Sequence, residues 1–232
     1  MKPYYDDGKG IVIYHGDCRE IIPSLKEKRF GLVCCDPPYG SGLAVDYAER
    51  FKNKSGDWWK NTDRSTQKRH VPIYGDDEPF EPSHLLAIKS EHKVLWGGNW
   101  YAARLPDSGG WWVWDKRNGK RDVSEADWPM SEAELAWTDV GKGCRVFRHT
   151  WFGLIRDSEN GEHFHPTQKP VVLMRWCIEM SKSDGLILDP YCGSGPTLRA
   201  AKDIGRKAIG IEINEQYCET AARRLQQEVF AL

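Results

Sequence analysis

Residues 185–213 read GLILDPYCGSGPTLRAAKDIGRKAIGIEI, and this stretch alternates a strand pattern with a helix pattern. The apolar run 185–188 predicts a buried strand, and the spacing of apolar residues predicts a helix over 197–204. Residues 207–213 predict the next strand, after which Asn214 can cap a terminal helix. A strand, a helix and a second strand in this order predict parallel strands in an α/β sheet.

The turn after the first of these strands carries Asp189-Pro190-Tyr191-Cys192-Gly193-Ser194-Gly195, and Glu212 ends the next strand. Glycines let a backbone approach a ligand closely, and an acidic side chain at the neighbouring strand end can accept hydrogen bonds from ribose hydroxyls. The turn lacks the third glycine of a dinucleotide site, because Leu198 stands at that position. Asp189 would repel a pyrophosphate but stabilise a sulfonium group, so the pattern favours S-adenosylmethionine over NAD. An ordinary glycine-rich turn is the alternative interpretation.

A second group, Asp36-Pro37-Pro38-Tyr39, follows the apolar run 31–35. Two consecutive prolines cannot continue a central strand, so they predict a rigid turn at a carboxyl end, where open parallel sheets bind ligands. The Asp36 carboxylate and the Pro37 carbonyl can accept the two N–H bonds of an amino group, and the carboxylate can stabilise the positive charge that develops when this nitrogen attacks a sulfonium methyl. Tyr39 offers a face on which a base can stack. A turn that merely ends a strand is the alternative.

The remaining apolar runs extend the α/β pattern along the chain. Strands are expected at 11–14, 93–96, 111–114 and 133–137, and helices at 19–25 and from Pro170 onward. Two polar stretches, 41–75 and 141–165, are expected to be irregular. Positions 50–70 hold seven basic residues against two acidic ones, with Trp58 and Trp59 between them, which fits phosphate contact or an ordinary solvated loop. The other tryptophans are expected in the core.

The composition is that of a globular chain with an excess of tryptophan. Its 232 residues suit one α/β domain, and the net charge of −1 means that binding to a polyanion requires a local basic patch. The seven cysteines are scattered and form no cluster of zinc spacing, so no metal is expected. The first residues contain no apolar leader, and no run approaches the ~20 apolar residues of a membrane span. We therefore expect a cytoplasmic protein with no membrane partner.

These motifs resemble those of the amino-group DNA methyltransferases in the permuted arrangement called the β class. In that family a D-P-P-Y segment comes first and the cofactor turn comes late, as found here at 36–39 and 189–195. The resemblance implies a circularly permuted, doubly wound, Rossmann-like methyltransferase fold with seven mostly parallel strands, one of them antiparallel. It also implies a double-stranded DNA substrate, one catalytic domain over 1–232 with DNA-contacting loops at 41–75 and 141–165, and it allows a homodimer.

The resemblance further implies which residues form the site. The catalytic residues would be Asp36, Pro37, Pro38 and Tyr39. The cofactor S-adenosylmethionine would be bound by Asp17, His165, Thr167, Lys169, Asp189, Pro190, Tyr191, Cys192, Gly193, Ser194, Gly195, Thr197 and Glu212. Within this set, Asp17 would contact the adenine amino group of the cofactor, and residues 165–170 would lie against its methionine portion.

The expected function is methyl transfer to the exocyclic N6 amino group of adenine in duplex DNA, by base flipping and direct transfer. The N4 amino group of cytosine is the near alternative. It is disfavoured because Asp36 rather than a serine precedes the two prolines, an argument from resemblance. Two further hypotheses stay open: methylation of RNA or of a protein amide, and a silent nucleic-acid-binding module.

Overall fold

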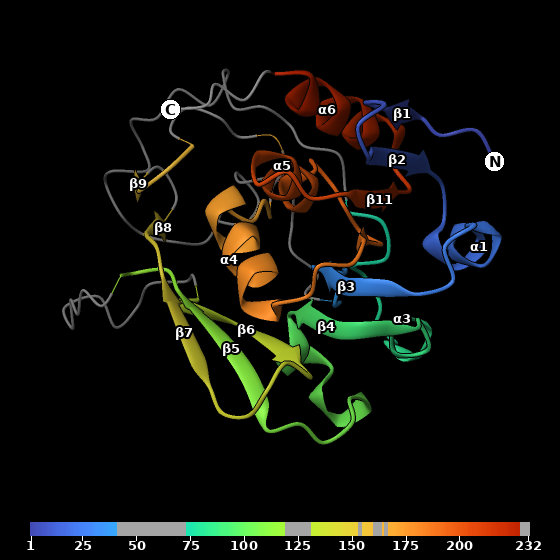
Figure 1. Ribbon diagram of the computed structural model, residues 1–232. Helices are drawn as coiled ribbons and strands as arrows, with labels where there is room; N and C mark the ends of the chain where they lie inside the picture. The colour runs from blue at the N-terminus through green and yellow to red at the C-terminus, as the bar shows by residue number, and fades with distance from the viewer. Residues whose placement is uncertain (41–72, 119–130, 153–154, 160–163, 165–166, 228–232) are drawn as a thin grey trace.

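The computed structural model describes residues 1–40, 73–118, 131–152, 155–159, 164 and 167–227. In this part of the chain, nine strands form one sheet in the order β1-β2-β11-β10-β3-β4-β6-β5-β7, with helices on both faces (Figure 1). The strands of this sheet are β1 (Tyr5–Asp6), β2 (Ile11–His15), β3 (Phe30–Cys35), β4 (Ser90–Trp96), β5 (Gly110–Asp115), β6 (Ala133–Thr138), β7 (Arg145–Arg148), β10 (Ile187–Asp189) and β11 (Ala208–Glu212).

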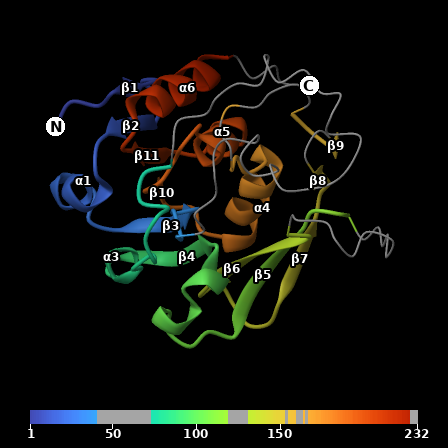
Figure 2. The ribbon, with the colours of Figure 1, turned by 180° about the vertical axis from the view of Figure 1, so that it is seen from behind.

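The seven central strands, from β2 to β5 in the sheet order, confirm the predicted fold. β6 pairs antiparallel with both β4 and β5, whereas the other pairs among these seven strands are parallel. The structure adds an edge strand at each end, β1 antiparallel to β2 and β7 parallel to β5. Figure 2 shows these two edge strands at opposite ends of the sheet.

The helices divide between the two faces of the sheet. One face carries α4 (Val171–Ser181), α5 (Pro196–Asp203) and α6 (Glu215–Gln226), and the other carries α1 (Cys18–Ser24) and the short α3 (Ser83–Leu86). Side chains alternate along β3, so Leu32 and Cys34 join the core under α4 to α6, whereas Val33 and Cys35 join the core under α1. β3 is therefore buried on both faces, as a central parallel strand should be.

The helix ends follow their sequence signals closely. The Asn214 side chain caps α6 by accepting the Gln216 amide at 2.9 Å, as predicted. Pro170 precedes α4 as its N-cap, with an extended ψ of 140°, so the helix begins one residue later than predicted.

Residues 141–165 are not the irregular stretch that was predicted. Their described part contains β7, which joins the main sheet, and a small hairpin of β8 (Trp151–Phe152) and β9 (Ile155–Arg156). The prediction failed because β7 has only four residues, with two apolar residues between two arginines, too short a run to separate from a loop. The other predicted loop, 41–75, lies outside the described residues except for its last three positions.

Most described tryptophans are buried, and Trp96, Trp112 and Trp114 are among the largest fully buried side chains. Trp100 contradicts the expectation of a core position, because 56% of it is exposed. It lies in the 3-10 turn η3 (Gly98–Trp100), which follows β4. All seven cysteines are free. Among the described helices, none combines the length and the apolar composition that crossing a membrane requires.

Candidate active site

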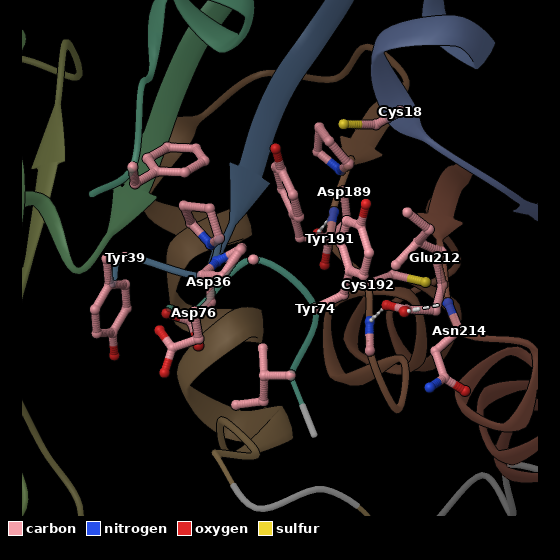
Figure 3. Close-up of a pocket in the computed structure, with 18 of the residues that line it drawn as sticks. Cys18, Asp36, Tyr39, Tyr74, Asp76, Asp189, Tyr191, Cys192, Glu212 and Asn214 are labelled. Atoms are coloured by element: carbon pink, nitrogen blue, oxygen red, sulfur yellow. Dashed lines mark hydrogen bonds between the residues drawn. The ribbon is translucent and has the colours of Figure 1, made fainter. Parts of the chain in front are cut away.

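The carboxyl ends of the parallel strands meet around one cavity of about 990 Å³. Asp36 follows β3, Asp189 ends β10 and Glu212 ends β11, so three acidic residues come together from separate parts of the chain. Figure 3 shows Asp36 and Tyr39 on one side of the cavity and Cys192 with Glu212 on the other. A cavity of this size at this edge is typical of a ligand site in an open α/β sheet.

The turn between β10 and α5 depends on its two glycines. Gly193 and Gly195 have φ of 49° and 77°, in the left-handed region that favours glycine. The Gly195 amide donates to the Cys192 carbonyl at 2.7 Å, and the Cys192 amide donates to the Ile211 carbonyl at 3.0 Å, which ties the turn to β11. A Cβ at Gly195 would lie only 3.0 Å from the Cβ of Ala221 on α6. The turn therefore tolerates no larger residue at this position without moving α6.

Glu212 holds the same turn from the neighbouring strand. Its Oε2 accepts the Gly193 amide at 2.8 Å and its Oε1 accepts the Asn214 amide at 2.8 Å (Figure 3). Burial raises the pKa of Glu212, and these two amides oppose that effect. Each carboxylate oxygen has two lone pairs, so the side chain keeps the capacity to accept ribose hydroxyls.

Asp189 is the most deeply placed acid of the cavity, with 3% of its surface exposed. Burial raises its pKa to about 7, against the opposing effects of the Thr197 hydroxyl and the Tyr191 amide. A neighbouring cation favours the ionised carboxylate, so a sulfonium or ammonium group in the cavity would lower this pKa. The buried acid beside an open glycine turn and a ribose acceptor fits S-adenosylmethionine.

The other predicted cofactor residues lie in the same wall, apart from Gly195, which does not line the cavity, and His165, which lies outside the described residues. The cavity is also lined by Thr167, Pro190, Tyr191, Cys192, Ser194 and Thr197. Burial raises the pKa of the Cys192 thiol well above its ordinary value, and only 2% of the residue is exposed. Cys192 is therefore a packing residue rather than a nucleophile.

Asp17 lines the cavity and also caps α1. Its Oδ1 accepts the Arg19 amide at 2.8 Å, and its Oδ2 pairs with the Arg19 guanidinium at 2.5 Å. The predicted contact with the adenine of the cofactor would share this carboxylate with Arg19, and it stays a prediction. Nearby, His84 Nε2 lies 2.7 Å from the Tyr191 hydroxyl and helps to orient that ring. His84 was missed at the level of sequence, because it stands in a short helix without a motif.

Asp36 has two oxygens in different surroundings. Its Oδ2 pairs with the Lys169 amine, whereas its Oδ1 is buried and has no hydrogen-bond partner within the described residues. Burial raises the pKa of Asp36 to about 6, although the Lys169 cation opposes this. Lys169 was predicted only as a cofactor residue; it lines the cavity, and its amine also pairs with the Asp36 carboxylate.

Two further charged residues of this region were missed at the level of sequence. Glu134 on β6 lies 3.0 Å from the Lys169 amine through its Oε2, and its Oε1 pairs with Lys116. Burial alone would raise the pKa of Glu134, but the Lys169 and Lys116 cations outweigh it and lower the pKa to about 2. The signal was a charged residue inside the largely apolar strand β6.

Tyr39 lies against the turn that follows β4. Its ring stacks on Trp100 with centroids 5.8 Å apart and an interplanar angle of 18°. A Cβ at Gly97 would lie 2.3 Å from Cδ1 of Tyr39, so the ring rests directly on the backbone of Gly97. This glycine, with φ of 71°, and the exposed Trp100 therefore determine where the Tyr39 ring lies.

Comparison with known proteins gives matches over the whole chain. A family model for DNA methylases of the N6/N4 type matches residues 111–223. The chain is 29% identical to the Type II methyltransferase M.ScaI of Streptomyces caespitosus, over 100% of this chain and 86% of that protein. It is 26% identical to the Type II methyltransferase M2.DpnII of Streptococcus pneumoniae, over 98% of this chain and 93% of that protein.

Solved structures share the fold. The cytosine-N4-specific PvuII DNA methyltransferase aligns with a TM-score of 0.59 at 15% identity, over 96% of this chain and 88% of its own. A DNA modification methylase of Thermus thermophilus, in complex with S-adenosyl-L-methionine, aligns with a TM-score of 0.52 at 17% identity, over 93% and 96% of the two chains.

The sheet and its cavity fit an S-adenosylmethionine-dependent methyltransferase, because a buried acid, a glycine turn and an acid at the neighbouring strand end line one cavity at the carboxyl edge of the sheet. The matches to DNA methylases and to Type II methyltransferases support an amino-group DNA methyltransferase.

Replacing Glu212 should weaken cofactor binding. In Glu212→Gln an amide NH₂ would face a backbone N–H where a carboxylate oxygen now accepts it, so we expect affinity for S-adenosylmethionine to fall about 10- to 100-fold. Isothermal titration calorimetry measures this directly. Glu215→Gln, an exposed change in the first turn of α6, is the matched control. Equal affinities in the two variants would contradict the role of Glu212.

Replacing Gly97 should displace Tyr39 and leave the cofactor half of the cavity unchanged. We expect Gly97→Ala to lower the rate of DNA methylation by about 100-fold, because its Cβ would overlap the Tyr39 ring. Gly141→Ala is the control, since Gly141 also has a left-handed φ, 64°, but its Cβ would meet nothing within 4 Å. If Gly97→Ala and Gly141→Ala lowered the methylation rate equally, backbone strain rather than displacement of the Tyr39 ring would be the cause.

Proposed function

We propose that this chain methylates the N6 amino group of adenine in duplex DNA, taking the base out of the helix and transferring the methyl group directly from S-adenosylmethionine. The observation that supports this most strongly is the Asp36 carboxylate, at the carboxyl end of β3. Its Oδ1 is buried and has no partner within the described residues, and it lies in the same cavity as the cofactor turn. A buried acceptor without a donor is costly, and an amino group bound there would supply the donor.

The chain can activate a weak nucleophile with its own acceptors. The lone pair of an exocyclic amino nitrogen is delocalised into the base, so acceptors on its N–H bonds help it to pyramidalise. Asp36 Oδ1 and the Pro37 carbonyl would accept these two N–H bonds, and the carboxylate would stabilise the positive charge that develops on the nitrogen. When bound, S-adenosylmethionine supplies an electrophilic methyl group on its sulfonium.

The burial of Asp36 supports base flipping. Only 16% of its side chain is exposed, and it lies at the wall of a cavity rather than on the surface. A base stacked within a duplex cannot bring its amino group to such a carboxylate, so the nucleotide would have to leave the helix. Tyr39 would then provide an aromatic face for the extruded base.

Adenine is favoured over cytosine because Asp36, rather than a serine, precedes Pro37. The likeness to the cytosine-N4-specific PvuII enzyme concerns the fold and does not bear on this choice. The Type II names of the two relatives support a role in a restriction–modification system.

The nature of the methylated base tests the proposal. The protein is incubated with duplex DNA and isotope-labelled S-adenosylmethionine, and the DNA is digested to nucleosides for mass spectrometry. We expect label in N6-methyldeoxyadenosine. Label in N4-methyldeoxycytidine would overturn the choice of base, and label in RNA or protein but not in duplex DNA would overturn the choice of substrate.

The role of Asp36 is tested separately by Asp36→Ala. We expect methyl transfer to fall by at least ~100-fold, because the acceptor of the target N–H is lost, while cofactor affinity stays nearly unchanged. Asp107→Ala, an exposed change away from the cavity, is the control. A large loss of cofactor binding in Asp36→Ala, measured by calorimetry, would show that Asp36 belongs to the cofactor half of the site.

A further inference from the structure

Four charged side chains form a row that leads from Lys116, directly after β5, to Asp36 at the wall of the cavity. Lys116 pairs with Glu134, Glu134 lies 3.0 Å from the Lys169 amine, and Lys169 pairs with Asp36. All four are largely buried, with 12%, 21%, 3% and 16% of their side chains exposed in that order. They come from separate regions of the sequence, so the fold alone brings them together.

We propose that Lys169, held in place by Glu134, is a positioning residue for the target amino group: it occupies Oδ2 of Asp36 and leaves Oδ1 as the oxygen that accepts the amino N–H. This rests on the proposed function, since it concerns how the same carboxylate acts. It assigns Lys169 to the base half of the site, through Asp36, rather than to the cofactor alone.

The geometry of Lys169 suits this role. The residue directly precedes Pro170, the N-cap of α4, and α4 packs against β3, whose carboxyl end carries Asp36. Its amine is fixed between two carboxylates, with 3% of the side chain exposed. A cation held in this way fixes the rotation of the Asp36 carboxylate, so one oxygen stays paired while Oδ1 has no partner in the described part of the chain.

The signs of the charges alternate along the row and sum to zero. This matters because an isolated buried carboxylate would take up a proton and lose its capacity to accept two donors, whereas a paired one stays ionised. Lys169 and Lys116 favour the ionised form of Asp36, and Glu134 disfavours it. The row therefore keeps Asp36 an anion without making it a strong base.

Other groups that face Asp36 are also ionisable. They are Asp189 from β10, Tyr101 from the segment after η3, and Cys35 and Tyr39 from its own strand and turn. Burial raises the pKa of each of these groups, so the tyrosines and the cysteine stay neutral over the pH range of interest. Asp189 is unchanged in every variant below, so it affects all of their pH profiles alike.

The experiment measures the pH dependence of kcat/KM for duplex DNA, which reports ionisation in the free enzyme. The wild-type rate should rise with pH as Asp36 ionises. Lys169→Met removes a cation, so the acid limb should move to higher pH by about 1 to 3 units. Glu134→Gln removes an anion, so the acid limb should move to lower pH. A structural defect would lower the rate of a variant, but it would not move the acid limbs of Lys169→Met and Glu134→Gln in opposite directions.

Matched controls are Lys26→Met and Glu27→Gln, two exposed changes whose profiles should coincide with the wild type. If Lys169→Met does not fold, Glu134→Gln still tests the direction, and Lys169→Arg should keep the wild-type profile because it keeps the cation. The inference would be overturned if the acid limbs of Lys169→Met and Glu134→Gln did not shift, or if both shifted in the same direction. If the wild type methylated no DNA amino group, the proposed function itself would fail, which is a different outcome.

Discussion

The parallel pairing of β3 with β10 is the constraint on which the rest of the site depends. The register places Leu32 beside Ile187 and Val33 beside Leu188, so both strands end at the same edge of the sheet. Asp189 ends β10 and Asp36 follows β3, which puts the acid of the cofactor turn next to the acid of the base site. A methyl donor and a methyl acceptor bound at these two strand ends would therefore be neighbours, whatever the order of the two motifs in the sequence.

Bringing carboxylates together in a buried place has an electrostatic consequence. Asp36, Asp189 and Glu212 all have pKa values raised by burial, so the cavity resists further negative charge and favours a cation. That suits S-adenosylmethionine, but it does not suit the phosphates of DNA. Contacts to the DNA backbone must then come from cations outside the cavity. Within the described residues, Arg145 and Arg148 on the exposed edge strand β7 are cations that lie outside the cavity.

The main features of the fold could be predicted from the sequence. The alternation of strands and helices, the turns at 36–39 and 189–195, and the acid at 212 each depend on local chemistry, because prolines stop strands and glycines permit left-handed turns. The position of β7 depends on pairing with β5, which a run of four residues without alternation does not predict. Local sequence patterns thus predicted the longer elements, whereas the short strand β7 forms through tertiary contacts that such patterns do not reveal.

The same distinction applies to the site. The predicted site residues lie in contiguous motifs, whereas Glu134, Lys116, Gly97 and His84 contact partners that are distant in sequence. Lys169 shows the difference most clearly, because its motif was recognised but its partner, Asp36, lies 133 positions away. Only the fold shows that a residue predicted to bind the cofactor also pairs with the Asp36 carboxylate.

One carboxylate outside the cavity connects the two halves of the site. Glu159 accepts the Val171 amide at 2.7 Å and the Gln168 side-chain amide at 2.8 Å, and it pairs with Arg224 at 3.0 Å. Arg224 in turn donates to the Ser194 carbonyl at 2.8 Å, within the cofactor turn.

The backbone of Glu159 has a φ of 53°, which is unfavourable for a residue with a side chain and persists where surrounding bonds determine it. Because Glu159 binds both to the segment that carries Lys169 and, through Arg224, to the cofactor turn, a shift of either half would strain the other. Glu159 thus connects the segment that carries Lys169 to the turn that carries Ser194, in addition to the pairing of the strands.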